Sequence, residues 1–264
     1  VCIRCSGRIN RSGKFNRQKI CTFFIKDGRM SDKISFVIDD VDVEGKKGQT
    51  ILEAARDAGI YIPHLCAHQD LEPFGACRVC TVLVNGRPQA ACTQPIAPGI
   101  IVENDTEKVN NMRRHIIEML FVEGNHFCPL CEKSGNCELQ ALAYRLGIPT
   151  PTLPYMFPIR DVDATHPEVL IDRNRCILCA RCVRASRDMD GKHVFGFVNR
   201  GIEKRLAVNA PTKLADTNIG SADKAVEICP VGSIIQKHVG YAVPIGKRLY
   251  DHEPIGSEIE AKSK

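Results

Sequence analysis

The chain has 264 residues, of which 44% are apolar and 25% charged, so its length and composition suit a globular protein of two or three small domains. Its 14 cysteines are unusual for such a protein. Because disulfide frameworks belong to short secreted chains and no stretch resembles a signal peptide, we expect a reducing compartment and a cytoplasmic protein. The longest apolar run, at 115–122, is too short to span a bilayer and contains Glu118, so no membrane span is expected.

Positive charge is concentrated near the N-terminus. Residues 1–29 contain eight Lys or Arg and one acidic residue, whereas the rest of the chain has 28 basic and 30 acidic residues. Such a segment could bind nucleic acid or an anionic membrane, but charged runs are more often solvated tails. We interpret residues 1–30 as a basic arm and expect no nucleic-acid partner, because the body of the chain is slightly acidic. The roles of the arm and of its Cys2, Cys5 and Cys21 stay open.

Residues 31–105 have the pattern of a small sheet packed with one helix. Thr50 is placed to cap the helix and Gly59 to end it. The dipeptide Asn85-Gly86 predicts a two-residue hairpin between adjacent strands. The expected elements are strands over 34–38 and 41–43, a helix over 51–58, two strands flanking the hairpin and a strand over 100–103.

The remaining chain divides into four expected segments. Residues 106–148 predict a helical domain, and five prolines over 149–168 predict a linker or an irregular wrapping segment. A small domain over 169–240 precedes a weakly patterned polar tail over 241–264. The expected elements are helices over 106–122, 136–146 and 222–228 and strands over 193–199 and 206–208.

A first set of four cysteines has the spacing C-x10-C-x2-C-x11-C and consists of Cys66, Cys77, Cys80 and Cys92. A Cys-x-x-Cys turn brings two thiolates to neighbouring positions on iron, and Gly75 lets the backbone pass close to inorganic sulfides. We therefore predict a [2Fe–2S] cluster at this set. A zinc site and ordinary buried thiols are the other interpretations.

Another set lies near the C-terminus and has the spacing C-x2-C-x2-C, from Cys176, Cys179 and Cys182. Three thiolates so spaced can surround one cubane cluster. In two-cluster ferredoxins a Cys-Pro follows three residues later and ligates a second cluster, but position 186 is Ser here. We expect Cys229, which precedes Pro230 after 46 intervening residues, to complete a single [4Fe–4S] site.

Between these sets, Cys128, Cys131 and Cys137 lie within ten residues and have no fourth cysteine nearby. All eleven cysteines outside the arm are then assigned. Neutral imidazole can ligate iron, as it does in Rieske centres, so a histidine is the natural fourth ligand. We favour His126, two residues before Cys128, over His115 further upstream, and predict a second [4Fe–4S] cluster here.

The order of the three sets resembles the N-terminal region of the large iron–sulfur subunit of respiratory complex I and that of some iron-only hydrogenases. The stretches that carry the resemblance are "HFCPLCEKSGNCELQ", "CILCARC" and the distant "CPVGSI", and the likeness covers residues 31–240. Because the chain ends soon after the last set, it is most similar to the small diaphorase subunit of cytoplasmic NAD-reducing bidirectional nickel–iron hydrogenases. Complex I members place the ligand histidine four residues before the first cysteine, where this chain has Gly124.

The resemblance implies an α+β protein with a β-grasp [2Fe–2S] domain, a helical His/Cys3 cluster domain and a ferredoxin-like [4Fe–4S] domain. It implies a partner subunit that holds FMN and binds NAD(H), and a nickel–iron hydrogenase module of small and large subunits. In this interpretation the chain is an electron-transfer subunit without a catalytic residue of its own. We find no Gly-rich dinucleotide fingerprint and no further cysteine pair for nickel.

Three other interpretations remain. The chain could be the equivalent subunit of an NAD-linked formate dehydrogenase or of an electron-bifurcating hydrogenase. A multi-zinc nucleic-acid-binding protein would have similar Cys-x-x-Cys pairs and a basic arm, but it would be colourless and bind in a salt-sensitive manner. A self-contained hydrogenase would need additional cysteines for a catalytic cluster.

Overall fold

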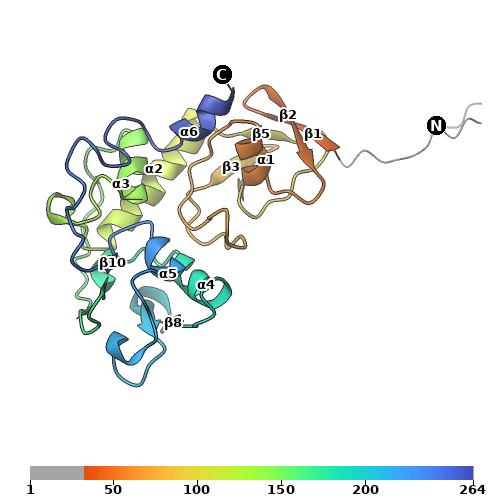
Figure 1. Cartoon of the computed structure of the whole chain (residues 1–264). Coiled ribbons are helices and arrows are strands. Elements are labelled where there is room, and N and C mark those ends of the chain that lie inside the picture. The colour runs from red at the N-terminus through yellow and green to blue at the C-terminus, as the bar shows by residue number, and fades with distance from the viewer. Residues whose placement is uncertain (1–32, 264) are drawn as a thin grey trace, which may run out of the picture. The chain divides into compact units, whose positions relative to one another are not determined.

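The computed structural model describes residues 33–263 (Figure 1). The basic arm, with Cys2, Cys5 and Cys21, falls outside the described residues. The strands are β1 (Lys33–Ile38), β2 (Val41–Lys46), β3 (Thr81–Val84), β4 (Arg87–Ala90), β5 (Ile101–Glu103), β6 (Val162–Asp163), β7 (Val169–Asp172), β8 (Phe195–Val198), β9 (Arg205–Val208) and β10 (Ile234–Gln236). The α-helices are α1 (Ile51–Asp57), α2 (Glu107–Val122), α3 (Glu138–Arg145), α4 (Arg181–Asp188), α5 (Lys224–Glu227) and α6 (Ser257–Glu260). This mixture agrees with the predicted α+β class.

The N-terminal sheet has the strand order β2-β1-β5-β3-β4. Strands β1 and β5 run parallel, and the other neighbouring pairs are antiparallel. The connection between β1 and β5 includes α1, which covers one face of the sheet through Ile51 and Leu52. A parallel pair with a helix crossing the sheet is the β-grasp arrangement that the family resemblance implies. The long loop between α1 and β3 carries three of the four cysteines of the first set.

Local sequence explains the ends of these elements. The Thr50 side chain accepts a hydrogen bond from the Glu53 amide, and the Glu53 carboxylate accepts one from the Thr50 amide at 2.7 Å, which makes a capping box at the start of α1. Asn85 and Gly86 have φ values of +49° and +77°, as a tight hairpin between β3 and β4 requires. The Thr50 cap and the Asn85-Gly86 hairpin were expected from the residue types, whereas the reciprocal bond from Glu53 was not predicted.

The helical region joins this sheet through one buried arginine. Arg113 on α2 is 1% exposed, and its guanidinium donates to the Thr81 carbonyl at 3.0 Å, the Asn104 carbonyl at 2.8 Å and Asn104 Oδ1 at 2.7 Å. The two peptide carbonyls lie at or beside the ends of sheet strands. Arg113 therefore satisfies backbone groups that α2 would otherwise bury without a partner.

Replacement of Arg113 by methionine is expected to lower the free energy of unfolding by about 3 kcal/mol, because three acceptors lose their donor in a buried place. The thermal midpoint should fall by roughly 6–12 °C. Arg114→Met is the matched control on the same helix, since the Arg114 side chain is 33% exposed and its carboxylate partner, Glu107, is 75% exposed. Thermal denaturation at equal iron content measures both, and equal small losses for the two variants would contradict the role of Arg113.

The proline-rich segment wraps the end of α2 and is not a free linker. The Met156 amide donates to the Val122 carbonyl at 3.0 Å, and Asn125 Nδ2 donates to the Pro158 carbonyl at 2.6 Å. Asn174 Nδ2 binds the Arg160 carbonyl at 2.9 Å. These bonds connect α2 to the loop that precedes Cys176.

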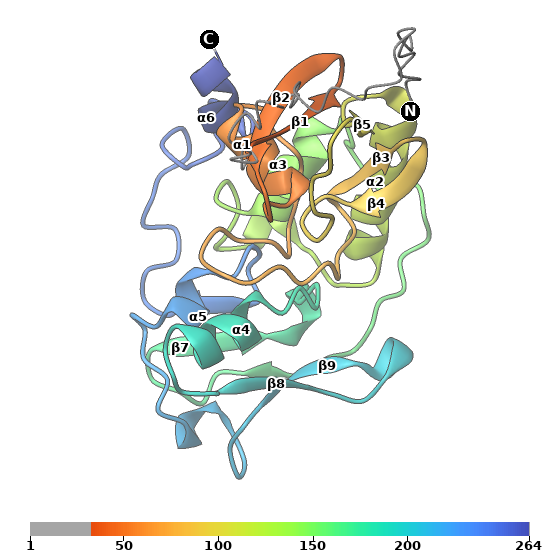
Figure 2. The ribbon, with the colours of Figure 1, turned by 90° about the vertical axis from the view of Figure 1, so that its right-hand side faces the viewer.

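The C-terminal region combines a three-stranded sheet, β10-β7-β6, with the β8–β9 hairpin. Helices α4 and α5 lie side by side next to this sheet (Figure 2). The loop between β7 and α4 carries Cys176 and Cys179, and Cys182 lies in the first turn of α4. Cys229 lies between α5 and β10, so the loop after β7, the first turn of α4 and the turn after α5 together carry the whole set.

The tail beyond residue 240 packs back onto the body. The Tyr250 amide donates to the Gly135 carbonyl at 3.0 Å, and Arg145 donates to the Ile255 carbonyl at 2.8 Å and pairs with Glu260. Ile255 is 7% exposed. The weak apolar pattern of this segment gave no sign of such packing, because its contacts are mainly polar and long-range.

Candidate iron–sulfur cluster sites

The first set of cysteines converges where the loop between α1 and β3 meets the residues that follow β4. The Cys66 amide lies 3.3 Å from Cys77 Sγ. The Cys66 thiol is hydrogen-bonded to those of Cys77 and Cys92, and the Cys80 thiol to that of Cys92. The bonds from neighbouring thiols hold the pKa of Cys66 well below its ordinary value. Neighbouring pairs of thiols suit a two-iron cluster, in which each iron is bound by two of the four thiolates.

The backbone around this set is left-handed at two positions, Gly75 and Arg78. Gly75 has a φ of +70°, and a Cβ there would lie 3.0 Å from Thr93 Cγ2. Arg78, between Cys77 and Cys80, has a φ of +61°, which is unfavourable for a residue with a side chain. Strain of this kind concentrates at binding loops, where the ligand geometry determines the backbone. The role of Gly75 beside inorganic sulfides stays a prediction.

The C-terminal set lines a single apolar cavity. Its walls include all four predicted ligands together with apolar side chains of β8, β9 and β10, namely Cys176, Cys179, Cys182, Cys229, Phe197, Leu206 and Ile234. Burial raises the pKa of Cys179 to about 12 and that of Cys182 well above its ordinary value. Leu178 and Ala180 have φ values of +53° and +61°, so the Cys-rich loop curls around this cavity.

The middle set begins in a 3-10 turn at Cys128–Leu130 and ends at Cys137, which directly precedes α3. The guanidinium of Arg175 lies 3.6 Å from Cys131 Sγ and also donates to Glu132 at 2.7 Å. Burial raises the pKa of Cys137 to about 12. The three thiols thus lie between α2, α3 and the loop before Cys176, with one cationic side chain beside them.

His126 has the features of a ligand that lacks its partner. Its Nε2 atom is buried and makes no hydrogen bond. The ring does bond the Leu120 carbonyl, so Nδ1 carries the proton and Nε2 keeps a free lone pair. Burial lowers the pKa of His126 to about 4, which keeps the imidazole neutral at pH 7. A neutral imidazole with one free nitrogen is the form that binds a metal.

His115, the alternative, has a different environment. It lies on the exposed side of α2, and its Nδ1 is 2.8 Å from the Asn111 carbonyl one helical turn earlier. That contact is an ordinary local bond of an exposed helical histidine. Of the two candidates, His126 is the one whose free nitrogen is buried.

Gly124 lies against the His126 ring. A Cβ at residue 124 would lie 2.7 Å from His126 Nε2 and 2.8 Å from the Asn174 carbonyl oxygen. The His126 imidazole therefore occupies space that a side chain at position 124 would enter. Position 124 is where complex I members carry their histidine, so the ring of His126 lies next to that position although it comes two residues later.

Direct contacts connect the middle and C-terminal sets. The Glu138 amide, next to Cys137, donates to the Pro230 carbonyl, next to Cys229, at 2.9 Å. Gly232 packs against the middle set so closely that a Cβ there would lie 2.7 Å from Cys131 Sγ. One hydrogen bond thus links the residue after a ligand of the middle set to the residue after a ligand of the C-terminal set.

Three arginines at these sites were not identified from the sequence: Arg175, Arg181 and Arg184. Arg184 donates to the carbonyl of Cys66 in the first set and is 5% exposed. Arg181 and Arg184 belong to "CARCVR" and lie one and two positions from the predicted ligand Cys182. This closeness to a ligand is the sequence feature that could have identified them.

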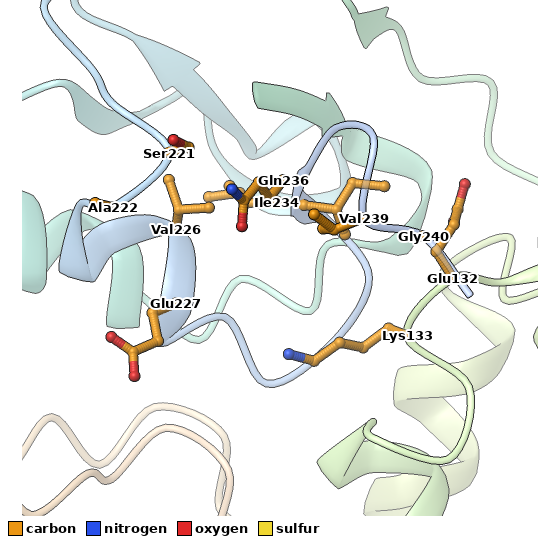
Figure 3. Close-up of a pocket in the computed structure, with 11 residues that line it drawn as sticks. Glu132, Lys133, Ser221, Ala222, Val226, Glu227, Ile234, Gln236, Val239 and Gly240 are labelled. Carbon is orange, nitrogen blue, oxygen red and sulfur yellow. The ribbon is translucent and has the colours of Figure 1, made fainter. Parts of the chain in front are cut away.

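A cavity of about 420 Å³ lies beside the middle set (Figure 3). Glu132 and Lys133 line one side of it, and Val226 and Glu227 of α5 line another. None of the twelve predicted ligands lines this cavity. Within residues 33–263, no three His, Cys, Asp or Glu side chains are placed to hold a single metal ion. Ligands of a multi-iron cluster are shared among its irons, so they need not meet at one point.

Three family models match consecutive parts of the chain. The 2Fe-2S iron-sulfur cluster binding domain matches residues 31–107, and the NADH-ubiquinone oxidoreductase-G iron-sulfur binding region matches 113–151. The NADH-quinone oxidoreductase subunit 3 ferredoxin-like domain matches 166–235. The fold and the three cysteine sets thus define an iron–sulfur protein with the modular order of the complex I large-subunit N-terminal region. None of the described helices is long and apolar enough to cross a membrane.

The gamma subunit of the NAD-reducing hydrogenase HoxS from Cupriavidus necator is 42% identical over 224 residues, which cover 84% of this chain and 95% of the relative. A chain in a crystal structure of an NAD+-reducing [NiFe]-hydrogenase in the H2-reduced state is 47% identical with a TM-score of 0.82, over 84% of this chain and 95% of that chain. This chain belongs to the family of the gamma subunit of NAD-reducing hydrogenase. The resemblance predicted from the cysteine spacing is therefore confirmed.

More distant relatives are much longer. The alpha subunit of NADPH-Fe(3+) oxidoreductase from Geobacter sulfurreducens is 35% identical over 77% of this chain but 24% of its own length. The mitochondrial 78 kDa subunit of NADH-ubiquinone oxidoreductase from Candida albicans is 34% identical over 75% of this chain and 28% of its own length. The matched part of this chain thus corresponds to about a quarter of each of these proteins.

Proposed function

We propose that this chain relays single electrons between a partner subunit that binds FMN and NAD(H) and a nickel–iron hydrogenase module of small and large subunits. The observation that carries the proposal is the packing of three thiolate-rich sets within one network of direct contacts. The Glu138–Pro230 hydrogen bond joins the middle and C-terminal sets. Arg184 joins α4, which carries Cys182, to the Cys66 carbonyl of the first set. Family membership supports the choice of the two ends of the route.

The proposed cofactors are one [2Fe–2S] cluster and two [4Fe–4S] clusters. Bound clusters of these kinds exchange one electron at a time, with potentials set by ligands, hydrogen bonds and burial. We assign the first to the domain over 31–105, and the other two to the domains over 106–148 and 169–240. The chain's own part is to fix the ligands and exclude water; we propose that it performs no bond chemistry itself and acts in the cytoplasm.

The donor sets fit these groups. Each outer set offers four thiols within one site, and the middle set offers three thiols and the free Nε2 of His126. An unpaired buried nitrogen costs about 1–3 kcal/mol, and coordination to iron would remove that cost. We therefore propose His126 as the fourth ligand of the middle site.

The full chain, prepared anaerobically, is expected to contain about ten irons and to show EPR signals from three clusters. NADH should reduce these signals only after the FMN-containing partner subunit is added, because in this proposal the partner alone binds flavin and nucleotide. Stopped-flow spectroscopy with and without the partner provides the comparison.

Stoichiometric zinc in place of iron would contradict the cluster assignment. Reduction by NADH without the partner, in a preparation free of flavin, would contradict the relay role. Transfer of electrons to a hydrogenase module of the same complex distinguishes the hydrogenase assignment from a formate dehydrogenase or another NAD-linked enzyme.

A further inference from the structure

Arg181 lies where residues next to a ligand of each set meet. It is the first residue of α4 and is 2% exposed. Its guanidinium donates to both carboxylate oxygens of Glu138, at 2.6 and 2.7 Å, and to the Ala67 carbonyl at 2.8 Å. Its Nε atom is buried without a partner.

Arg181 and its two partners, Ala67 and Glu138, each adjoin a predicted cluster ligand in the sequence. Ala67 follows Cys66 of the first set, Glu138 follows Cys137 of the middle set, and Arg181 precedes Cys182 of the C-terminal set. One guanidinium thus joins residues adjacent to a predicted ligand in each of three segments that are far apart in sequence. A rotation or shift of any segment would break a hydrogen bond to Arg181.

The chemistry of the Arg181–Glu138 pair suits a contact that fixes the relative positions of these segments. A guanidinium is planar and permanently charged, so two parallel bonds to a carboxylate fix orientation as well as distance. A lysine could keep the charge but could not maintain all three bonds in one plane. Because the pair is largely removed from water, the charge of either member acts on its surroundings with little screening when the other is lost.

We propose that Arg181, paired with Glu138, is a positioning residue that holds the three ligand sets together and balances the charge beside the middle and C-terminal clusters. The inference rests on the proposed cluster content. Loss of the arginine charge leaves the Glu138 carboxylate unpaired, which makes reduction of both clusters harder. Loss of the carboxylate charge leaves the guanidinium unpaired, which makes their reduction easier.

The test is an EPR-monitored redox titration of the full chain carrying its clusters. For Arg181→Met, we expect the ratio of reduced to oxidised middle cluster at a fixed potential to fall about tenfold, which is ~59 mV for a one-electron couple. For Glu138→Gln the shift should have the opposite sign. The double variant should return towards the wild-type potential, and Arg181→Lys should keep it, because each restores charge balance.

Arg145→Met is a matched control. Arg145 also pairs with a carboxylate, that of Glu260, and with one backbone carbonyl, that of Ile255, but none of these residues adjoins a predicted ligand. It should leave the potentials unchanged. Shifts of the same sign in the two single variants, or a double variant whose potential stays as low as that of Arg181→Met, would overturn the charge-balancing role.

Two results separate this inference from the proposed function. A wild-type chain without middle and C-terminal cluster signals refutes the cluster assignment itself. Intact wild-type signals with potentials that Glu138→Gln does not move refute only the inference. Because Glu138 is 24% exposed, Glu138→Gln remains informative even if Arg181→Met does not fold.

Discussion

Replacement of His126 by alanine is expected to open one iron of the middle cluster, so that this iron or the whole cluster is lost. The imidazole has a buried Nε2 without a partner, and its other nitrogen is held by the Leu120 carbonyl. No other described histidine combines these two features. Iron content should fall by about one to four atoms per chain, with the middle EPR signal absent or changed to that of an incomplete cubane.

The controls are a second histidine, on α2, and a different substitution at position 126. His115→Ala should spare the cluster, because this exposed ring bonds only the Asn111 carbonyl among the described contacts. His126→Cys should keep a cubane with a lower potential, since a thiolate adds one negative charge beside the irons. An intact middle signal in His126→Ala, together with its loss in His115→Ala, would transfer the ligand role to His115.

A substitution at Gly124 tests the same geometry without removing a ligand. Its Cβ would lie within 2.8 Å of both the His126 ring and the Asn174 carbonyl, and the second of these is backbone that cannot turn away. Gly124→Ala should therefore move the imidazole and weaken the middle signal. Gly220→Ala is the control, because a Cβ there would meet no atom closer than 3.6 Å.

Local sequence signals predicted most of the N-terminal domain. Thr50, Gly59 and Asn85-Gly86 determine conformation through their own backbone and side-chain preferences, and the structure places a helix start, a helix end and a hairpin at these residues. The cysteine sets were visible for a similar reason, because a thiolate spacing has few chemical uses. Such features depend on neighbours along the chain and are readable without a fold.

The contacts between the sets could not be predicted in this way. Arg181 binds residues 43 and 114 positions away, and the Glu138 amide binds a carbonyl on a distant turn. Neither contact has a local pattern, because an arginine on a short helix is ordinarily solvated. The packing of the tail could not be predicted from the sequence either. Ile255 is buried through contacts that only the tertiary structure specifies.

Replacement of Gly232 by alanine is expected to damage the middle cluster rather than the C-terminal one, although Gly232 follows Cys229 by only three residues. The new Cβ would lie 2.7 Å from Cys131 Sγ and 3.3 Å from the guanidinium of Arg175. Contacts this short force the sulfur away from its place, and overpacking of a well-packed site typically costs about 1–3 kcal/mol. We expect the middle EPR signal to lose about half of its intensity or more.

Gly196→Ala provides the matched control for this last experiment. Gly196 lies on β8 in the same C-terminal region, and a Cβ there would meet no atom within 4 Å. Neither glycine has a positive φ, so both substitutions leave the backbone unstrained and differ only in what the methyl group touches. If Gly232→Ala abolishes the C-terminal signal and leaves the middle one intact, the contact between Gly232 and Cys131 does not shape the middle site. Selective loss of the middle signal instead shows that the segment after Cys229 forms part of the wall of the middle site. The same packing brings the middle and C-terminal sets within one hydrogen bond of each other.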